Sequence, residues 1–165
     1  SKIVFVPWYC GGERVILDTA GKEGDGVIST IRLQDRVRGE VKFGGASVVG
    51  SKVYFAPYNP DVVGVYDTAA NEGHGSFDTI SLEGKVRGGG KFNGSAVVDD
   101  KVHFAPSHAG VVGVVDTAAN EGAGAFSVLS LENKVDGEYL FDGAAVVGNK
   151  VYFGPSNADC IGVVE

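Results

Sequence analysis

The chain contains no methionine, two cysteines, three histidines and one tryptophan, and its 14 basic residues are outnumbered by 21 acidic ones. The formal net charge of −7 argues against binding to a phosphate backbone as the main task, because such binding needs a basic surface. No hydrophobic run approaches the roughly 20 residues of a transmembrane helix. We therefore expect neither a nucleic-acid partner nor a transmembrane segment.

The few cysteines and histidines offer no metal site. Cys10 and Cys160 form no CxxC motif, and no histidine stands near either at ligand spacing. His74, His103 and His108 occupy three non-equivalent positions of the repeat described below, so they cannot converge on one zinc ion without ligands from another chain. We predict no metal, no cofactor and no catalytic residue.

The two cysteines and the first residue bear on the compartment. Cys10 and Cys160 are either two ordinary thiols or, because they fall in equivalent loops of the first and last repeats, a disulfide between two copies of the chain. An opening Ser1 without methionine indicates a processed product or an excerpt of a longer chain. Processing favours a secreted or organelle-lumenal protein.

The 165 residues, 44% of them hydrophobic, suit one domain over residues 1–165, and 26 of them are glycine. An internal repeat dominates this domain. Residues 52–100 align with residues 101–149 without a gap, and 29 of the 49 positions are identical. Residues 2–51 form a more divergent copy, and residues 150–165 form a partial fourth copy.

Each repeat holds four short runs rich in valine and aromatic residues and bounded by turn-forming residues, which predicts four strands. No stretch shows the apolar period of a long helix. Four strands repeating every 40–50 residues are typical of a β-propeller blade. A threefold trefoil or prism uses repeats of similar size, but it has no place for a fourth partial copy.

The segments KVYFAPYN and VVGVYDTAAN resemble the YVTN-type β-propeller repeat, and FNGSAVV is similar to the Gly-x-Ala-Val strand of that family. Similar tandem repeats also occur in uncharacterised algal proteins. The chain departs from the family in its Phe-Ala-Pro segment and its long glycine-rich connection. The resemblance implies that the Gly-x-Ala-Val-Val strand lies innermost, where Gly45, Gly94 and Gly143 would let neighbouring strands approach.

With that strand phase, the chain is an all-β propeller of about four four-stranded blades, with strands tallied as 3+4+4+3. The first blade lacks its inner strand and the last lacks its outer strand, which would leave exposed strand edges. We therefore expect an incomplete ring, or half of a larger propeller, that a second copy or another chain completes. Two copies would give about eight blades, within the usual range.

The same phase sorts the loops onto two faces. One face holds the hairpins and the Asp-Thr-Ala loops, which repeat closely, so we assign Asp18, Asp67 and Asp116 to turns. The other face holds the loops that differ between repeats, where a specific contact would be encoded. The candidate binding residues on this variable-loop face are Trp8, Tyr9, Arg36, Arg38, Tyr58, Asn59, Asp61, Arg87, His108, Asn157 and Asp159.

Aromatic residues together with arginine suit a protein-binding surface, so we expect a non-enzymatic binding or scaffold module whose variable-loop face engages a protein partner. Trp8 and Tyr58 would equally suit stacking on a sugar ring, which keeps a carbohydrate-binding propeller open; alternatively they merely cover the mouth of the channel. A propeller hydrolase or lactonase is a third hypothesis, but it needs converging carboxylates or histidines that the sequence does not offer.

Overall fold

The computed structural model describes residues 2–8, 13–18, 27–33, 36–37 and 40–165. Apart from two single-turn 3-10 helices, the regular structure of these residues is all β, which confirms the predicted class. The fourteen strands of the described residues are β1 (Lys2–Val4), β2 (Glu13–Asp18), β3 (Val27–Arg32), β4 (Phe43–Val49), β5 (Lys52–Pro57), β6 (Val62–Asp67), β7 (Ser76–Ser81), β8 (Phe92–Val98), β9 (Lys101–Pro106), β10 (Val111–Asp116), β11 (Ala125–Ser130), β12 (Phe141–Val147), β13 (Lys150–Pro155) and β14 (Gly162–Val164).

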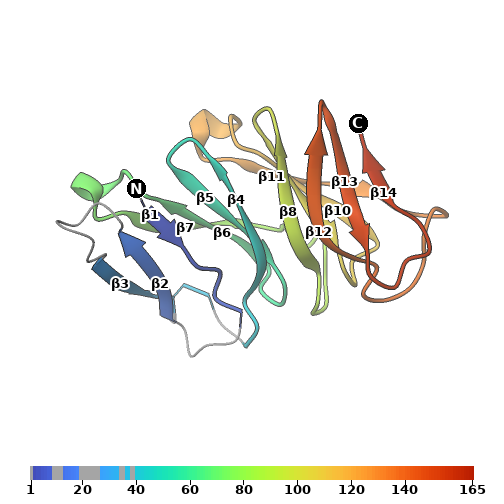
Figure 1. Cartoon of the computed structure of the whole chain (residues 1–165), viewed down its shortest axis with the longest axis horizontal. Coiled ribbons are helices and arrows are strands. Elements are labelled where there is room, and N and C mark those ends of the chain that lie inside the picture. The colour runs from blue at the N-terminus through green and yellow to red at the C-terminus, as the bar shows by residue number, and fades with distance from the viewer. Residues whose placement is uncertain (1, 9–12, 19–26, 34–35, 38–39) are drawn as a thin grey trace.

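The strands form four antiparallel sheets, named here in chain order (Figure 1). The first sheet has the order β1-β2-β3, the second β4-β5-β6-β7, the third β8-β9-β10-β11 and the fourth β12-β13-β14. The strand numbers are therefore three, four, four and three, as the repeat predicts, and no sheet closes on itself within the described residues. Strands β4, β8 and β12 lie side by side in the centre of the molecule (Figure 1).

Local sequence explains where these strands end. Asp67 accepts the N–H of Ala69 and the hydroxyl of Ser51, both at 2.9 Å, and these bonds hold the pKa of its carboxyl below the usual range. Asp116 accepts the N–H of Ala118 at 3.1 Å in the same way. Both aspartates thus hold the turn after a strand, whereas the side chain of Asp18 lies outside the described residues. The 3-10 turns η2 (Asn71–Gly73) and η3 (Asn120–Gly122) begin only later in these loops.

Successive sheets pack face to face, and the same two kinds of face meet at each contact described below. We call the face turned toward the next sheet along the chain the front, and the opposite face the back. The front of the second sheet offers small, β-branched and tyrosine side chains, and the back of the third sheet covers them with phenylalanines and valines. The front residues are Tyr54, Ala56, Val63 and Val65, and the back residues are Phe92, Val102, Phe104, Val115 and Phe126. The third sheet packs on the fourth in the same way.

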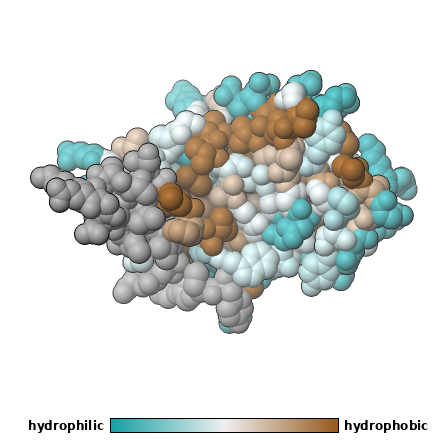
Figure 2. All heavy atoms as spheres, viewed as in Figure 1, coloured by the Kyte–Doolittle hydropathy of each residue, from teal (hydrophilic) through white to brown (hydrophobic). Residues whose placement is uncertain are grey.

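Glycines allow the central strands to approach this closely. A methyl group on Gly45 would lie 2.7 Å from the Cα of Gly94, and one on Gly94 would lie 2.5 Å from the Cα of Gly143. Such distances leave no room for a side chain. Toward the solvent, Figure 2 shows a band of hydrophobic residues on this side of the molecule. Val48 of β4 and Val146 and Val147 of β12 are exposed hydrophobic residues. In the described part of the chain, no helix is long and apolar enough to cross a membrane.

Candidate binding face

Backbone hydrogen bonds tie the variable loops of all four repeats into one surface. Lys42 N–H donates to the carbonyl of Trp8, Tyr58 N–H to Lys42, and Lys91 N–H to Tyr58, at 2.8–3.2 Å. The series continues with Ser107 donating to Lys91, Leu140 to Ser107, and Ser156 to Leu140, each at 2.9 Å. The loop positions that vary between repeats therefore stand in a row, each held by the connection between two sheets. These residues come from the loops and connections that the repeat assigns to the variable-loop face, whose role in binding stays a prediction.

Two pairs of aromatic rings lie on this face. The rings of Trp8 and Tyr58 lie 4.7 Å apart between centroids, and His108 meets the edge of Tyr139 at 4.1 Å. Burial, and then the charge of Tyr139, raise the pKa of Tyr58. Trp8 is 43% exposed and Tyr139 is 50% exposed. We call these four residues the aromatic cluster.

Several predicted binding residues also hold the loops together. Asn59 Nδ2 donates to the carbonyl of Glu40 at 2.8 Å, and its Oδ1 accepts the N–H of Gly90 at 3.0 Å. Asn157 donates to the carbonyl of Glu138 at 3.2 Å in the equivalent loop. Both side chains therefore bridge a variable loop to the connection that precedes it, so mutating them would disturb the face as well as any contact.

Asp61 and Arg36 also have partners within the chain. Asp61 pairs with Lys91 at 3.0 Å, and the Lys91 ammonium donates to the carbonyl of Asn59 at 2.7 Å. Arg36 donates from its guanidinium to the carbonyl of Phe77 at 2.9 Å. The Asp61 carboxylate remains largely open to solvent, so it can serve both the loop and a ligand.

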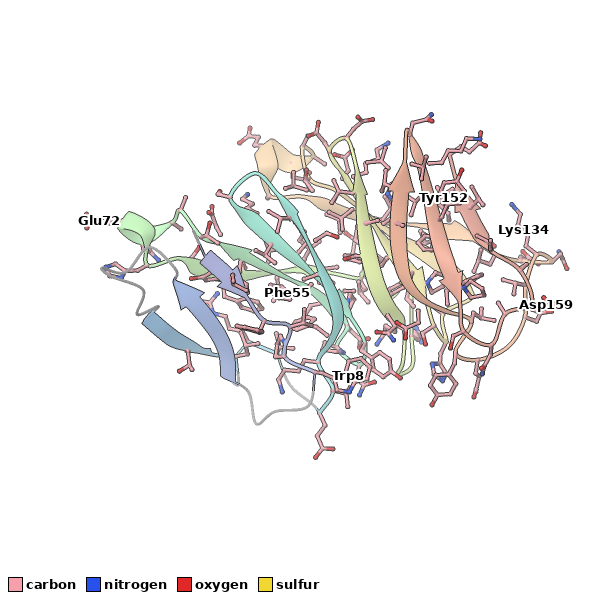
Figure 3. The ribbon with its side chains drawn as sticks, viewed as in Figure 1. Trp8, Phe55, Glu72, Lys134, Tyr152 and Asp159 are labelled. Atoms are coloured by element: carbon pink, nitrogen blue, oxygen red, sulfur yellow. The ribbon has the colours of Figure 1, made fainter. Side chains whose placement is uncertain are left out.

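The remaining predicted residues are not gathered in one place. Arg87 and Asp159 are exposed, and Figure 3 shows Asp159 apart from Trp8, at the end of the molecule that also carries Lys134. Tyr9, Arg38 and Cys10 lie outside the described residues. Cys160 is an exposed free thiol. The disulfide between copies stays a prediction.

Sequence reasoning missed Tyr139 as a member of the site. The sequence does mark this position as variable, because the residues equivalent to Tyr139 in the preceding repeats are Val41 and Gly90. The φ of +54° at Tyr139 also shows that the backbone is held in a conformation that tyrosine rarely adopts. Glu138 next to it lies 3.9 Å from His108 Nε2 and adds a negative charge to the rim of the cluster. The cluster therefore suits a partner that presents an apolar or aromatic group beside basic side chains.

A cleft of about 690 Å³ opens at the other side, between the third and fourth sheets. His103 lines it, and no group in the described residues hydrogen-bonds its buried Nδ1. Burial, and then the charge of Lys101, lower the pKa of His103. Asp116 and Glu165 also line the cleft. Within the described ranges, no three histidine, cysteine or acidic side chains are grouped so that they could hold a metal ion.

We expect acidification below pH 6.5 to lower the free energy of unfolding. The folded chain keeps His103 neutral, whereas the unfolded chain takes up the proton near the ordinary pKa of 6.5. Between the lowered pKa and 6.5 the unfolded state binds more protons, so stability is complete above pH 6.5 and falls as the pH drops, by at most about 1.4 kcal/mol per pH unit. Urea unfolding at pH 7.5, 6.5 and 5.5 measures this loss.

The matched variant is His103→Tyr, because Tyr54 and Tyr152 occupy the equivalent positions. The loss of stability between pH 7.5 and 5.5 should shrink in this variant, while the carboxylates continue to titrate at lower pH. An identical pH dependence in both proteins would show that His103 is not the group responsible.

No protein-family model matches the chain, and no curated protein is significantly similar to it. The case for a function therefore depends on the geometry of the variable-loop face.

Proposed function

We propose that the chain is a non-enzymatic binding module that engages a protein partner through its variable-loop face. The observation that carries this proposal is the aromatic cluster on the hydrogen-bonded row of loops. Half-exposed tryptophan and tyrosine on a rigid surface are the residues that most often dominate the energy of a protein interface. Because the loops are already ordered by backbone bonds, little conformational entropy remains to be lost on binding.

For the fold, we propose an arc of a β-propeller of the YVTN type. Three features support this. The sheets follow one another in chain order, each packs its front on the back of the next, and the glycine-bearing strands β4, β8 and β12 meet at one side. A radial array of four-stranded sheets combines these features.

We propose further that a second copy completes the assembly. The front of the fourth sheet exposes Ile161 and Val163, although the equivalent Val112 and Val114 of the third sheet are buried. On the first sheet, Ile3 and Phe5 are about half exposed, whereas their equivalents Val53 and Phe55 are buried against the preceding sheet. Inside the chain, the front of one sheet packs on the back of the next. A head-to-tail pair of copies would therefore bury the front of the fourth sheet of one copy against the back of the first sheet of the other.

Site-specific photocrosslinking tests the loop-face proposal. A benzophenone amino acid at Tyr139 should crosslink a protein in an extract of the cells that produce the chain, and the same group at Glu72 should not. Figure 3 shows Glu72 at the end of the molecule opposite Lys134, well apart from Trp8 of the cluster. Crosslinking of the same species from both positions, or from neither, would contradict the proposal.

Variants then separate the cluster from the rest of the surface. With the purified partner, we expect Trp8→Ser and Tyr139→Gly each to weaken binding by roughly tenfold or more, as for hot-spot aromatics. Each variant introduces the residue that another repeat carries at the equivalent position, which is Ser107 for Trp8 and Gly90 for Tyr139. Val48→Ser removes an exposed hydrophobic residue outside the loops and should leave the affinity unchanged.

A carbohydrate ligand is the second candidate, because the exposed ring of Trp8, which packs against Tyr58, also suits the face of a sugar. A glycan array probed with the wild-type chain and with Trp8→Ser distinguishes the two functions. Binding to a glycan that Trp8→Ser abolishes, without a protein crosslink at position 139, would favour the carbohydrate-binding function.

A further inference from the structure

His108 on the variable-loop face has a ring nitrogen that accepts no hydrogen bond from the described residues. Its other ring nitrogen, Nδ1, lies 3.1 Å from the carbonyl oxygen of Gly90 and 3.4 Å from the hydroxyl of Ser107. A carbonyl can only accept, so the contact with Gly90 assigns the proton of the neutral imidazole to Nδ1. Nε2 is then an acceptor with a free lone pair.

A second acceptor faces this lone pair. The carboxylate oxygen Oε2 of Glu138 lies 3.9 Å from His108 Nε2, which is too far for a hydrogen bond between the two atoms. Neither atom carries a proton when the imidazole is neutral, so the pair lacks a donor. The spacing leaves room for a nitrogen with two N–H groups that lies about 2.9 Å from both acceptors.

The neighbouring side chains favour a cation as this donor. The Glu138 carboxylate is 77% exposed, and no lysine or arginine of the described residues pairs with it. The ring of Tyr139, whose centroid lies 4.1 Å from that of His108, is half exposed and borders the same space. A cation at this point would meet a negative charge, a lone pair and an aromatic ring.

The loops on both sides of His108 are in place. Its backbone N–H donates to the carbonyl of Gly90, in the connection between the second and third sheets, at 2.9 Å. On the other side, Asn157 of the fourth repeat donates its backbone N–H to the carbonyl of Tyr139 at 2.9 Å and its side chain to that of Glu138 at 3.2 Å. The two unfilled acceptors therefore do not depend on any strand beyond the fourth sheet.

The equivalent position of the second repeat is satisfied within the chain. Asn59 stands where the third repeat has His108. Its amide donates to the carbonyl of Glu40, and its oxygen accepts the N–H of Gly90. The imidazole of His108 also donates to a carbonyl of the preceding connection, but its Nε2 accepts nothing from the described residues. The change from asparagine to histidine thus creates an open acceptor.

We propose that His108 Nε2 and Glu138 form a site for an arginine side chain of the protein partner, with Tyr139 stacking on the guanidinium. This inference rests on the proposed function and describes its partner chemically. A guanidinium carries five N–H donors in one plane, so it can serve two acceptors at once and stack on an aromatic ring. Lysine offers a point charge without that plane. The net charge of −7 favours the approach of a basic segment.

Peptides test the site directly. The full chain, labelled with ¹⁵N, is titrated at pH 7.5 with acetyl-glycyl-arginyl-glycinamide, and its backbone amides are followed by NMR. We expect saturable shifts at residues 107–109 and 138–140. The citrulline peptide keeps the shape of arginine but carries no charge, so it should bind more weakly by roughly tenfold or more. The lysine peptide should bind roughly threefold more weakly, because it does not stack.

The imidazole of His108 provides a spectroscopic signature. Long-range proton–nitrogen correlation distinguishes its two nitrogens. In the free chain Nε2 should resonate as the unprotonated nitrogen, and its signal should move upfield when the guanidinium donates to it. A free chain with the proton on Nε2, or with both nitrogens protonated beside Glu138, would overturn the proposal because no acceptor would be left.

Variants of the chain locate the peptide. Glu138→Gln keeps the shape of the side chain and should weaken binding of the arginine peptide roughly tenfold. Glu121→Gln removes the same charge from an exposed residue of η3 and should change the affinity by less than about twofold. His108→Asn introduces the residue of the second and fourth repeats and should weaken binding roughly fivefold. Equal losses from Glu138→Gln and Glu121→Gln would refute the site, because only the net charge would then matter.

The result can be separated from that of the loop-face proposal. If a protein crosslinks at position 139 but the arginine peptide does not bind at millimolar concentration, the face engages a partner without an arginine site, and this inference is wrong. Equal affinity for the arginine and citrulline peptides would overturn it as well. Binding of the arginine peptide without any protein crosslink would support the site and contradict the protein partner proposed above.

Discussion

Gly94→Ala is expected to lower the free energy of unfolding by about 2–5 kcal/mol. The new methyl group would lie 2.5 Å from the Cα of Gly143 on the neighbouring strand, so the two sheets would have to separate. Overpacking of this kind costs about 1–3 kcal/mol, and the φ of +100° at Gly94 adds about 1–2 kcal/mol for any residue with a side chain. A domain with a total stability of about 5–15 kcal/mol would lose a large part of it.

Gly143→Ala is the matched control for this experiment. Gly143 also has a positive φ, +78°, but among the described residues a methyl group there meets no atom within 4 Å beyond its two neighbours in sequence. Gly143→Ala should therefore lower the free energy of unfolding only by the backbone strain of about 1–2 kcal/mol. Urea unfolding of both variants measures the difference, which isolates the contact between central strands. Equal losses in the two variants would mean that the close approach of β8 to β12 contributes nothing to stability.

Lys91→Ala is expected to destabilise the chain by about 2–4 kcal/mol, whereas Lys91→Leu should change stability by less than about 1.5 kcal/mol. The Lys91 side chain is only 1% exposed, so its truncation leaves a cavity between the variable loop and the third sheet. Leucine fills this space, as Leu140 does at the same position one repeat later, where it is buried. The carbonyl of Asn59, which loses the ammonium in both variants, belongs to an exposed residue that water can reach.

Thermal unfolding of the two variants, followed by circular dichroism, checks this prediction. The same samples can be examined for the fluorescence of Trp8, which is the one tryptophan of the chain. Because the backbone of Lys91 continues the row of hydrogen bonds from Tyr58, Lys91→Leu should leave the environment of Trp8 unchanged. If leucine proves as damaging as alanine, then the ammonium and not the hydrocarbon stem stabilises this site.

The repeat allowed the strands and their order to be predicted closely. Runs such as Val62–Asp67 combine β-branched residues with turn-forming neighbours, and both signals act over a few residues. The 49-residue period then places equivalent strands in successive sheets. The division of the loops into a constant and a variable face also follows from the strand order, because consecutive turns of an antiparallel sheet lie at opposite ends of its strands.

The site was less accessible to such reasoning. Asn59 and Asp61 were expected to face a ligand, but both also hold loops, and their partners Gly90 and Lys91 lie about 30 residues away. The approach of Tyr139 to His108 similarly depends on two loops that are distant in the chain. No local pattern encodes such contacts. They arise because stacking of the sheets brings the connections of one repeat against the loops of the next.

The amino-acid sequence by itself determined the all-β class, the order of the strands and the turns between them, because these depend on side chains within a few residues of one another. Only the tertiary structure decided which of the equivalent side chains are hydrogen-bonded or buried. Among the described residues, the side chains of Arg36 and Lys85 each donate to a backbone carbonyl whereas that of Lys134 does not, and Val114 is buried whereas the equivalent Val163 is about half exposed. Equivalent residues differ in this way because burial and hydrogen bonding depend on the neighbouring sheet, which the sequence of a single repeat does not contain.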